Sequence, residues 1–105
     1  MDADAKGLEI KQVKKDGVLT CKLTGWLDPN TSPTLLAELD LDNINSLIFD
    51  LQNVEYVFSA GLRAMLVFQR ILEEKNGSIK LINVPDAIRF IFEDTGLESM
   101  LERKV

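Results

Sequence analysis

The stretch from residue 46 to residue 82 has the pattern of a strand, a helix and a second strand, and this order constrains the fold more than any other feature. Ser46–Leu51 is apolar enough to predict a strand buried on both faces. Ser59–Lys75 is a strong helical pattern that stops at Asn76–Gly77, and Ser78–Ile82 resembles another buried strand. Such units favour right-handed crossovers, so we expect a mixed sheet covered by helices.

Two further strands are predicted before this unit. Leu8–Val13 is expected to form an edge strand that ends in a polar hairpin turn at residues 14–17. Val18–Thr24 alternates apolar and polar residues, which is typical of a strand with one covered face. The segment Gly25–Asn30 interrupts this alternation.

Two more helices complete the pattern. Thr31 or Ser32 is expected to be the N-cap of a first helix, with Pro33 near its first position and Leu35, Leu36 and Leu39 on its core face. Pro85 opens a last helix that ends at Thr95–Gly96, and residues 97–101 add a short turn. The apolar residues of this last helix are Ile88, Phe90, Ile91 and Phe92. The elements together predict one small α/β domain over residues 1–105.

Composition excludes several classes of function. The 105 residues are 46% hydrophobic, which is enough for one core and one domain. The net charge of −5 argues against a nucleic-acid-binding protein, and the basic pairs Lys14–Lys15 and Arg103–Lys104 are too short to build a basic stripe. The chain has no histidine and one cysteine, Cys21, so it offers no zinc site and excludes serine–histidine and cysteine–histidine catalysis, and we expect no metal site.

The same residues bear on location. A lone cysteine cannot form an internal disulfide, which fits a reducing cytoplasm. Met1–Lys6 is polar and acidic, unlike the start of a secretory signal. The apolar runs are far shorter than the roughly 20 residues that span a bilayer, so we expect no membrane insertion.

The segment Thr24–Asp28 is the first candidate site. If Leu27 points inward, then Trp26 and Asp28 both point outward at the end of the strand. Trp26 has two interpretations, a plug at the periphery of the core or an exposed anchor for a partner. Asp28 taken alone is typical of a turn or cap residue.

Ser59 is the second candidate, because it stands where a loop becomes a helix N-terminus. The N–H groups there lack helical partners and the helix dipole is positive, so an anionic group on Ser59 would be tolerated well. A plain N-cap serine is the simpler interpretation. The segment is not a G-x-S-x-G elbow, and no glycine-rich phosphate loop is present.

The helix that follows Ser59 is the third candidate. It carries two apolar stripes, which are wider than one core contact needs. Either the helix is fully buried, or Val67, flanked by Arg63 and Arg70, lies on an exposed partner surface. Arg63 could also hold an acidic partner or a phosphate through paired hydrogen bonds.

Read together, these segments resemble STAS domains, and in particular bacterial anti-sigma factor antagonists. GWLDPNTSPTLLAEL resembles the family's G-x-L-D entry to its first helix. SLIFDLQNVEYVFSAGLRAML resembles its central strand followed by S-x-G-L and the second helix, and SIKLINVPDAIRFIFEDTGLESML its last strand, third helix and T-G-L ending. The resemblance implies a small mixed β-sheet with helices packed mainly on one face.

The resemblance also implies a function. In this family the unphosphorylated protein binds an anti-sigma factor that is also a serine kinase, and so releases a sigma factor. The kinase then phosphorylates the serine that matches Ser59, which ends binding until a serine phosphatase removes the phosphate. Asp28 matches an aspartate close to that serine, and Thr31 and Gly61 match flanking positions. The residues expected to bind the partner are Trp26, Asp28, Asn30, Thr31, Phe58, Ser59, Ala60, Gly61, Arg63, Val67 and Arg70.

One position departs from the family. Phe58 stands where an aspartate often precedes the switch serine, which makes the predicted face more apolar and points to a divergent partner. The expected protein is therefore a cytoplasmic, non-enzymatic binding module without a cofactor, as a monomer or a weak dimer. The alternative is a stand-alone STAS subunit of a membrane transport complex. An enzyme or a nucleotide-binding protein is the third hypothesis, and the sequence shows no base–nucleophile pair or phosphate cradle for it.

Overall fold

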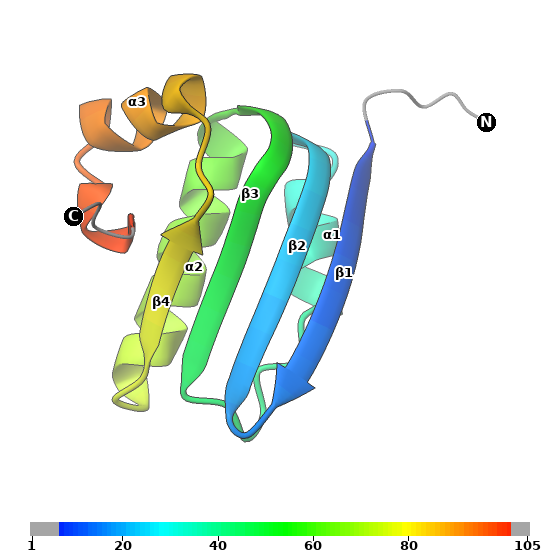
Figure 1. The fold of residues 1–105 in the computed structure, drawn as a ribbon, viewed down its shortest axis with the longest axis vertical. Helices are drawn as coiled ribbons and strands as arrows, with labels where there is room; N and C mark the ends of the chain where they lie inside the picture. The colour runs from blue at the N-terminus through cyan, green and yellow to red at the C-terminus, as the bar shows by residue number, and fades with distance from the viewer. Residues whose placement is uncertain (1–6, 102–105) are drawn as a thin grey trace.

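The computed structural model describes residues 7–101 as one mixed sheet with helices against it. Two segments used in the predictions above lie outside the described residues. They are Met1–Lys6, which is unlike a secretory signal, and the basic pair Arg103–Lys104. The sheet has the order β1-β2-β3-β4 (Figure 1). Its strands are β1 (Leu8–Lys15), β2 (Val18–Leu27), β3 (Ser46–Val57) and β4 (Ser78–Ile82). The helices are α1 (Ser32–Glu38), α2 (Ser59–Glu74), α3 (Asp86–Asp94) and the short 3-10 turn η1 (Glu98–Met100).

The strand pairing confirms the predicted mixed sheet. β1 and β2 form an antiparallel hairpin whose turn places Asp16 at φ 53° and Gly17 at φ 80°. β3 pairs in parallel with β2 on one side and with β4 on the other. Each parallel pair is joined by a helix, α1 or α2, as crossover connections require.

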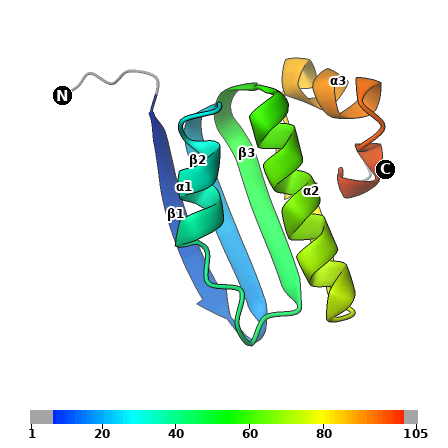
Figure 2. The same cartoon turned by 180° about the vertical axis from the view of Figure 1, so that it is seen from behind.

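The helices cover one face of the sheet, as the family resemblance implied. Figure 1 shows the uncovered face, and Figure 2 shows α1 and α2 lying across the other one. In β3, Leu47, Phe49 and Leu51 are fully buried beneath the helices, whereas Ile48 and Asp50 are only half-buried. The expectation that this strand is buried on both faces is therefore wrong, because no described element covers the second face.

β2 and β3 are both longer than predicted. β2 continues through Gly25 to Leu27, and β3 continues to Val57. Their ladder contains two register shifts in this region, and Gly25 has φ 118° and lies so close to Gly7 that a Cβ could not fit. In β2 the inward position after Leu23 is taken by a glycine, and in β3 the buried positions change spacing after Leu51, so the apolar pattern of the sequence ends before the strands do.

β4 spans the predicted residues but is not a fully buried strand. It lies at the edge of the sheet, and only Leu81 is fully buried. The free side of Leu81 forms an isolated parallel bridge with Leu101. A strand with one neighbour leaves half of its backbone groups for other partners, which explains why the C-terminal segment folds back here.

The helix boundaries agree with the sequence to within about one residue, but the burial of one predicted core residue differs. In α1, Leu35 and Leu39 are buried as expected, whereas Leu36 is 38% exposed, so its predicted place in the core is wrong. α2 ends where Asn76 adopts φ 60° and the Gly77 N–H donates to the Leu72 carbonyl at 2.6 Å. This confirms the predicted Asn76–Gly77 stop.

One hydrophobic core lies between the helices and the sheet. Phe49 of β3 meets Phe68 of α2 with ring centroids 5.4 Å apart, and Ile88 and Phe92 of α3 are also buried. Cys21 is completely buried, and desolvation, followed by the nearby Glu38 carboxylate, raises the pKa of its thiol to about 12. Within residues 7–101, no helix is both long enough and apolar enough to cross a membrane.

Candidate partner-binding surface

The ends of β2 and β3 bring the candidate residues together at one end of the sheet. Leu27 pairs with Val57 in the parallel ladder, and the Phe58 N–H then donates to the Leu27 carbonyl at 2.8 Å. The turn after β2 and the start of α2 therefore lie side by side. The segment that holds Asp28 and the segment that holds Ser59 meet there, as the resemblance implied.

Asp28 and Thr31 hold each other in a reciprocal pair. The Asp28 carboxylate accepts hydrogen bonds from the N–H groups of Asn30 at 2.8 Å and Thr31 at 2.9 Å. The Thr31 hydroxyl accepts from the Asp28 N–H at 3.0 Å and donates to the Trp26 carbonyl at 2.7 Å. Asp28 is thus a turn residue, one of the two roles expected of it alone, and Asn30 is exposed beside it.

Thr31 takes the N-cap position of α1, but its side chain does not cap the helix. Its hydroxyl is already used by Asp28 and Trp26, and Pro33 lies in the first turn, as predicted. The Ser32 N–H donates to the Asp28 carbonyl at 2.9 Å, so helical hydrogen bonding begins at Asp28. The turn is therefore fixed by its own hydrogen bonds, which leaves it rigid beside α2.

Ser59 is exposed and is the first residue of α2. The prediction that Ser59 is the N-cap of this helix is therefore wrong. The N-cap is Phe58, with φ −90° and ψ 174°, and no side chain caps this end. The N–H groups of Gly61 and Leu62 both donate to the Phe58 carbonyl. Within the described part of the chain, the N–H groups of Ser59 and Ala60 have no partner, so this end can accept an anionic group.

Gly61 lets α2 approach β2 closely. A Cβ at this position would lie 2.8 Å from the Leu27 Cβ and 3.0 Å from the Val57 Cγ1. Real Cβ atoms almost never approach other atoms this closely, so a side chain would push the start of the helix away from the sheet. Gly61 is buried and thus positions Ser59 without being accessible to a partner itself.

Trp26, Tyr56 and Phe58 form a surface cluster, which we call the aromatic cluster. Trp26 stacks on Phe58 with centroids 5.9 Å apart, and Phe58 meets Tyr56 edge-on at 4.7 Å. Trp26 is half-buried, whereas Tyr56 and Phe58 are 43% and 40% exposed. Trp26 thus combines its two interpretations, because it packs against the exposed rings of Tyr56 and Phe58 while keeping part of its own surface accessible.

A groove between α1 and α2, the α1–α2 groove, gathers a second group of candidates. Its volume is about 430 Å³, and it is lined by Pro29, Ser32, Pro33, Leu36, Ala60, Arg63, Ala64 and Val67. Val67 is 44% exposed, which favours the exposed interpretation of this helix face over full burial. Ser32 is buried, and its hydroxyl has no hydrogen-bond partner within residues 7–101.

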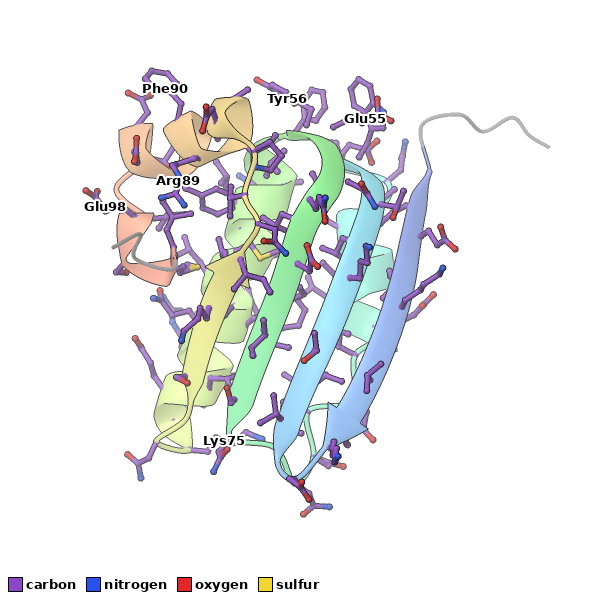
Figure 3. All side chains as sticks on the ribbon, viewed as in Figure 1. Glu55, Tyr56, Lys75, Arg89, Phe90 and Glu98 are labelled. Atoms are coloured by element: carbon purple, nitrogen blue, oxygen red, sulfur yellow. The ribbon has the colours of Figure 1, made fainter. Side chains whose placement is uncertain are left out.

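A second groove, the α2–α3 groove, lies on the other side of Ser59. Its volume is about 510 Å³, and it is lined by Tyr56, Val57, Phe58, Ser59, Leu62, Ala87, Phe90, Ile91, Asp94 and Thr95. Figure 3 shows Tyr56 and Phe90 projecting at the same end of the molecule. Neither residue was among the predicted site residues. The signal for Phe90 is its position two residues from both Ile88 and Phe92, off the stripe that packs into the core.

Most of the predicted partner residues therefore share one surface. The aromatic cluster, the Asp28–Thr31 turn and the first turn of α2 adjoin through the ends of β2 and β3, and Ala60, Arg63 and Val67 line the α1–α2 groove. Arg70 is exposed on the same helical stripe but does not line this groove. No clustered set of metal-binding side chains occurs among the residues that the structure describes.

Comparisons with known proteins give a consistent picture. Residues 9–105 match the family model described as STAS domain. The anti-sigma-B factor antagonist of Staphylococcus aureus is 29% identical over 97 residues, which cover 90% of each chain. Among solved structures, unphosphorylated SpoIIAA, an anti-sigma factor antagonist, matches with a TM-score of 0.82 at 19% identity, over 92% of this chain and 89% of the other.

Two further structures extend the comparison. The phosphorylated form of Bacillus SpoIIAA matches with a TM-score of 0.74 at 19% identity, over 92% of each chain. A sulfate transporter family protein from Wolinella succinogenes matches with a TM-score of 0.70 at 18% identity, over 85% of this chain and 79% of the other. At these identities the structures establish a shared fold, and the same fold serves proteins with different roles.

Proposed function

The chain belongs to the STAS domain family, and on that premise we propose that it is an anti-sigma factor antagonist whose binding is switched by phosphorylation of Ser59. Unmodified, it binds an anti-sigma factor that is also a serine kinase, and a sigma factor or similar regulator is released. The similarity to the Staphylococcus aureus antagonist supports this role. The observation that carries the switch is the exposure of Ser59 at the first position of α2, beside two unpartnered N–H groups.

A phosphate on Ser59 would change the charge of the surface without requiring a new fold. It adds about −1.5 to −2 charge at neutral pH, next to a helix N-terminus that favours anions. A kinase surface that fits a neutral serine would then face a dianion that it cannot pair. Leaving such a charge unpaired at a desolvated contact costs several kcal/mol, so one modification can weaken binding by orders of magnitude.

The surface that we assign to the kinase consists of the Asp28–Thr31 turn, Phe58 and Ser59, and the α1–α2 groove with Arg63 and Val67. Its exposed aromatic and arginine side chains are the types that dominate binding energy at interfaces. A serine phosphatase completes the cycle by restoring the unmodified form. We place this cycle in the bacterial cytoplasm, and we assign the chain a binding role without catalysis or cofactor.

The alternative is a STAS subunit of a membrane transport complex. The shared fold with a sulfate transporter family protein and the apolar surface around Phe58 favour it. In that case Ser59 would only begin a helix, and its modification would not control binding. The two functions therefore differ in which partner binds and in whether Ser59 matters.

A pull-down from native cells tests both functions. Tagged wild type, Ser59→Ala and Ser59→Asp serve as baits, and mass spectrometry identifies the bound proteins. We expect wild type and Ser59→Ala to recover a small ATP-binding kinase that Ser59→Asp loses. Recovery of the same transporter subunits by all three baits would favour the transport complex instead. Val13→Ala is the control bait, because Val13 is exposed and lies on the uncovered face of the sheet.

A further inference from the structure

Ser59 lies at the boundary between two grooves with opposite charge. Arg63 is the only charged residue among those that line the α1–α2 groove. Asp94 is the only charged residue among those that line the α2–α3 groove, and Ser59 itself is in that lining. A phosphate on Ser59 would therefore add negative charge to a groove that already carries a carboxylate.

The α2–α3 groove has an apolar lining in which Val57, Leu62 and Ile91 pack against the core, whereas the rings of Phe58 and Phe90 are exposed. In α3, Ile88 and Phe92 are buried, while the groove is lined by residues of a different stripe, Ala87, Phe90, Ile91 and Asp94. Phe90 is 65% exposed and Phe58 is 40% exposed. Exposed phenylalanines that converge on one hollow are typical of a surface that a partner covers.

The opposite wall is held rigid by its own contacts. The Tyr56 and Phe58 rings meet edge-on at 4.7 Å, and Trp26 contacts both of them, with ring centroids 6.5 Å from Tyr56 and 5.9 Å from Phe58. The backbone of Phe58 is fixed by its hydrogen bonds to Leu27, Gly61 and Leu62. Rigid rings lose little conformational entropy on binding, so this wall can contribute affinity at low cost.

We propose that the α2–α3 groove binds an amphipathic helical segment of a partner, with an apolar anchor for the aromatic rings and basic residues that face Asp94 and Ser59. We further infer that phosphorylation of Ser59 strengthens this contact. The inference rests on the proposed function in one respect. It assigns the groove to the serine phosphatase, which is the partner that must recognise the phosphorylated protein. The kinase binds the unmodified state through the surface that includes the α1–α2 groove.

The sign of the phosphate effect follows from the charges on the groove. Phosphoserine at position 59 would place a second anionic group in the lining that already contains Asp94, which raises the negative potential of the groove. A basic segment offsets this potential and pairs with both groups through charge-assisted hydrogen bonds. A neutral or acidic segment cannot do so. The same modification can thus dismiss one partner and recruit another.

The test uses a synthetic probe, so it does not depend on finding either natural partner. The probe is a helical peptide of about 16 residues, long enough to hold a helix, with leucine and phenylalanine four residues apart and arginines one turn away. Its twin has glutamate in place of arginine. ¹⁵N-labelled protein, unmodified or carrying phosphoserine incorporated at position 59, is titrated with each peptide and followed by NMR.

We expect the arginine peptide to shift the signals of Tyr56, Phe58, Leu62, Phe90 and Ile91, and to bind about tenfold more tightly to the phosphorylated protein. Phe90→Ala should weaken binding at least about fivefold, and Asp94→Asn should weaken it less. Val13→Ala is the matched control, because Val13 is 66% exposed and Phe90 is 65% exposed, and Val13 lies on the uncovered sheet face.

Four results would overturn the inference: no shifts in the groove, shifts confined to another surface, equal binding of the glutamate twin, or weaker binding after phosphorylation. Failure of the proposed function looks different. If the pull-down finds no kinase that depends on Ser59 but the peptide binds as described, the groove is a basic-segment site and the switch is wrong. If the kinase is found and the peptide fails, the groove assignment alone is wrong.

Discussion

Ser59 and Gly61 are two residues apart and do opposite things. Ser59 is exposed, whereas Gly61 is buried against Leu27 and Val57. Both residues belong to the S-x-G-L motif, but only the structure separates the exposed candidate from the glycine that lets α2 approach the sheet. This separation can be tested through stability.

Gly61→Ala should lower the free energy of unfolding by about 1–3 kcal/mol, because the new methyl group would overlap the Leu27 side chain. Ser59→Ala is the matched control and should change it by less than about 0.5 kcal/mol. Urea unfolding followed by circular dichroism measures both. Equal stabilities for the two variants would show that α2 does not need the close approach at Gly61.

Cys21 should resist modification and should make stability fall at high pH. Burial raises the pKa of its thiol from 9.0 to about 12, so the folded protein keeps the neutral thiol where the unfolded chain ionises. This contribution to stability is complete below pH 9 and is lost as the pH rises toward 12. Urea titrations between pH 7 and about 11 should show a steeper loss for wild type than for Cys21→Ala. Parallel pH dependence of the two would contradict this.

At the scale of elements, α3 carries two faces with different purposes. Phe92 is fully buried, whereas Phe90, two residues earlier, is 65% exposed on the wall of the α2–α3 groove. An apolar residue on the second face does not change the packing of the core, but it enlarges the exposed apolar surface. The two phenylalanines therefore form a matched pair for separating folding from binding.

Phe92→Ala should destabilise the domain by about 3–5 kcal/mol, since it leaves a cavity in the core. Phe90→Ala should change the free energy of unfolding by less than about 0.5 kcal/mol. Thermal and urea unfolding of both variants measure the difference. A large loss of stability in Phe90→Ala would show that its ring packs into the core, and the groove assignment would then lose its main anchor.

The order of the elements and most of their boundaries could be predicted from the sequence, because Asn76–Gly77 after α2 and the prolines near the starts of α1 and α3 are local signals. The second half of β3 could not, since its buried positions change spacing after Leu51 where the ladder shifts register. The exposure of Leu36 and Phe90 depends on how wide a face the sheet covers, which no local pattern reports. Ser59 could be proposed as a site from its motif and its helix terminus. The α2–α3 groove could not be predicted, because segments far apart in the sequence line it.

At the scale of the whole molecule, the candidate partner-binding surface lies at one end of the sheet. The helices cover one face of the sheet, and the ends of β2 and β3 present the turn, the aromatic cluster and the start of α2 together. Among residues 7–101, the backbone pairings and ring contacts that hold this end together do not use the Ser59 side chain. A switch at Ser59 can therefore act through the charge of the surface while the fold stays the same.

Phosphorylation of Ser59 should leave the fold intact. NMR spectra of the ¹⁵N-labelled protein with and without the phosphate should differ near residues 26–31 and 56–62 and around Asp94, with the core signals unchanged. The free energy of unfolding should change by no more than about 1 kcal/mol, and stabilisation by the helix terminus is the expected direction. Widespread shifts in the core would show that the switch works through a conformational change instead.

The central claim is that phosphate on Ser59 ends the binding of the kinase. The most direct measurement is calorimetric titration of the kinase recovered in the pull-down with the purified domain, unmodified and phosphorylated on Ser59, at the same salt concentration. We expect the phosphorylated domain to bind the kinase at least about 100-fold more weakly, while Ser59→Ala binds like wild type. Equal affinities of the two forms would contradict it, because Ser59 would then be no more than the first residue of a helix.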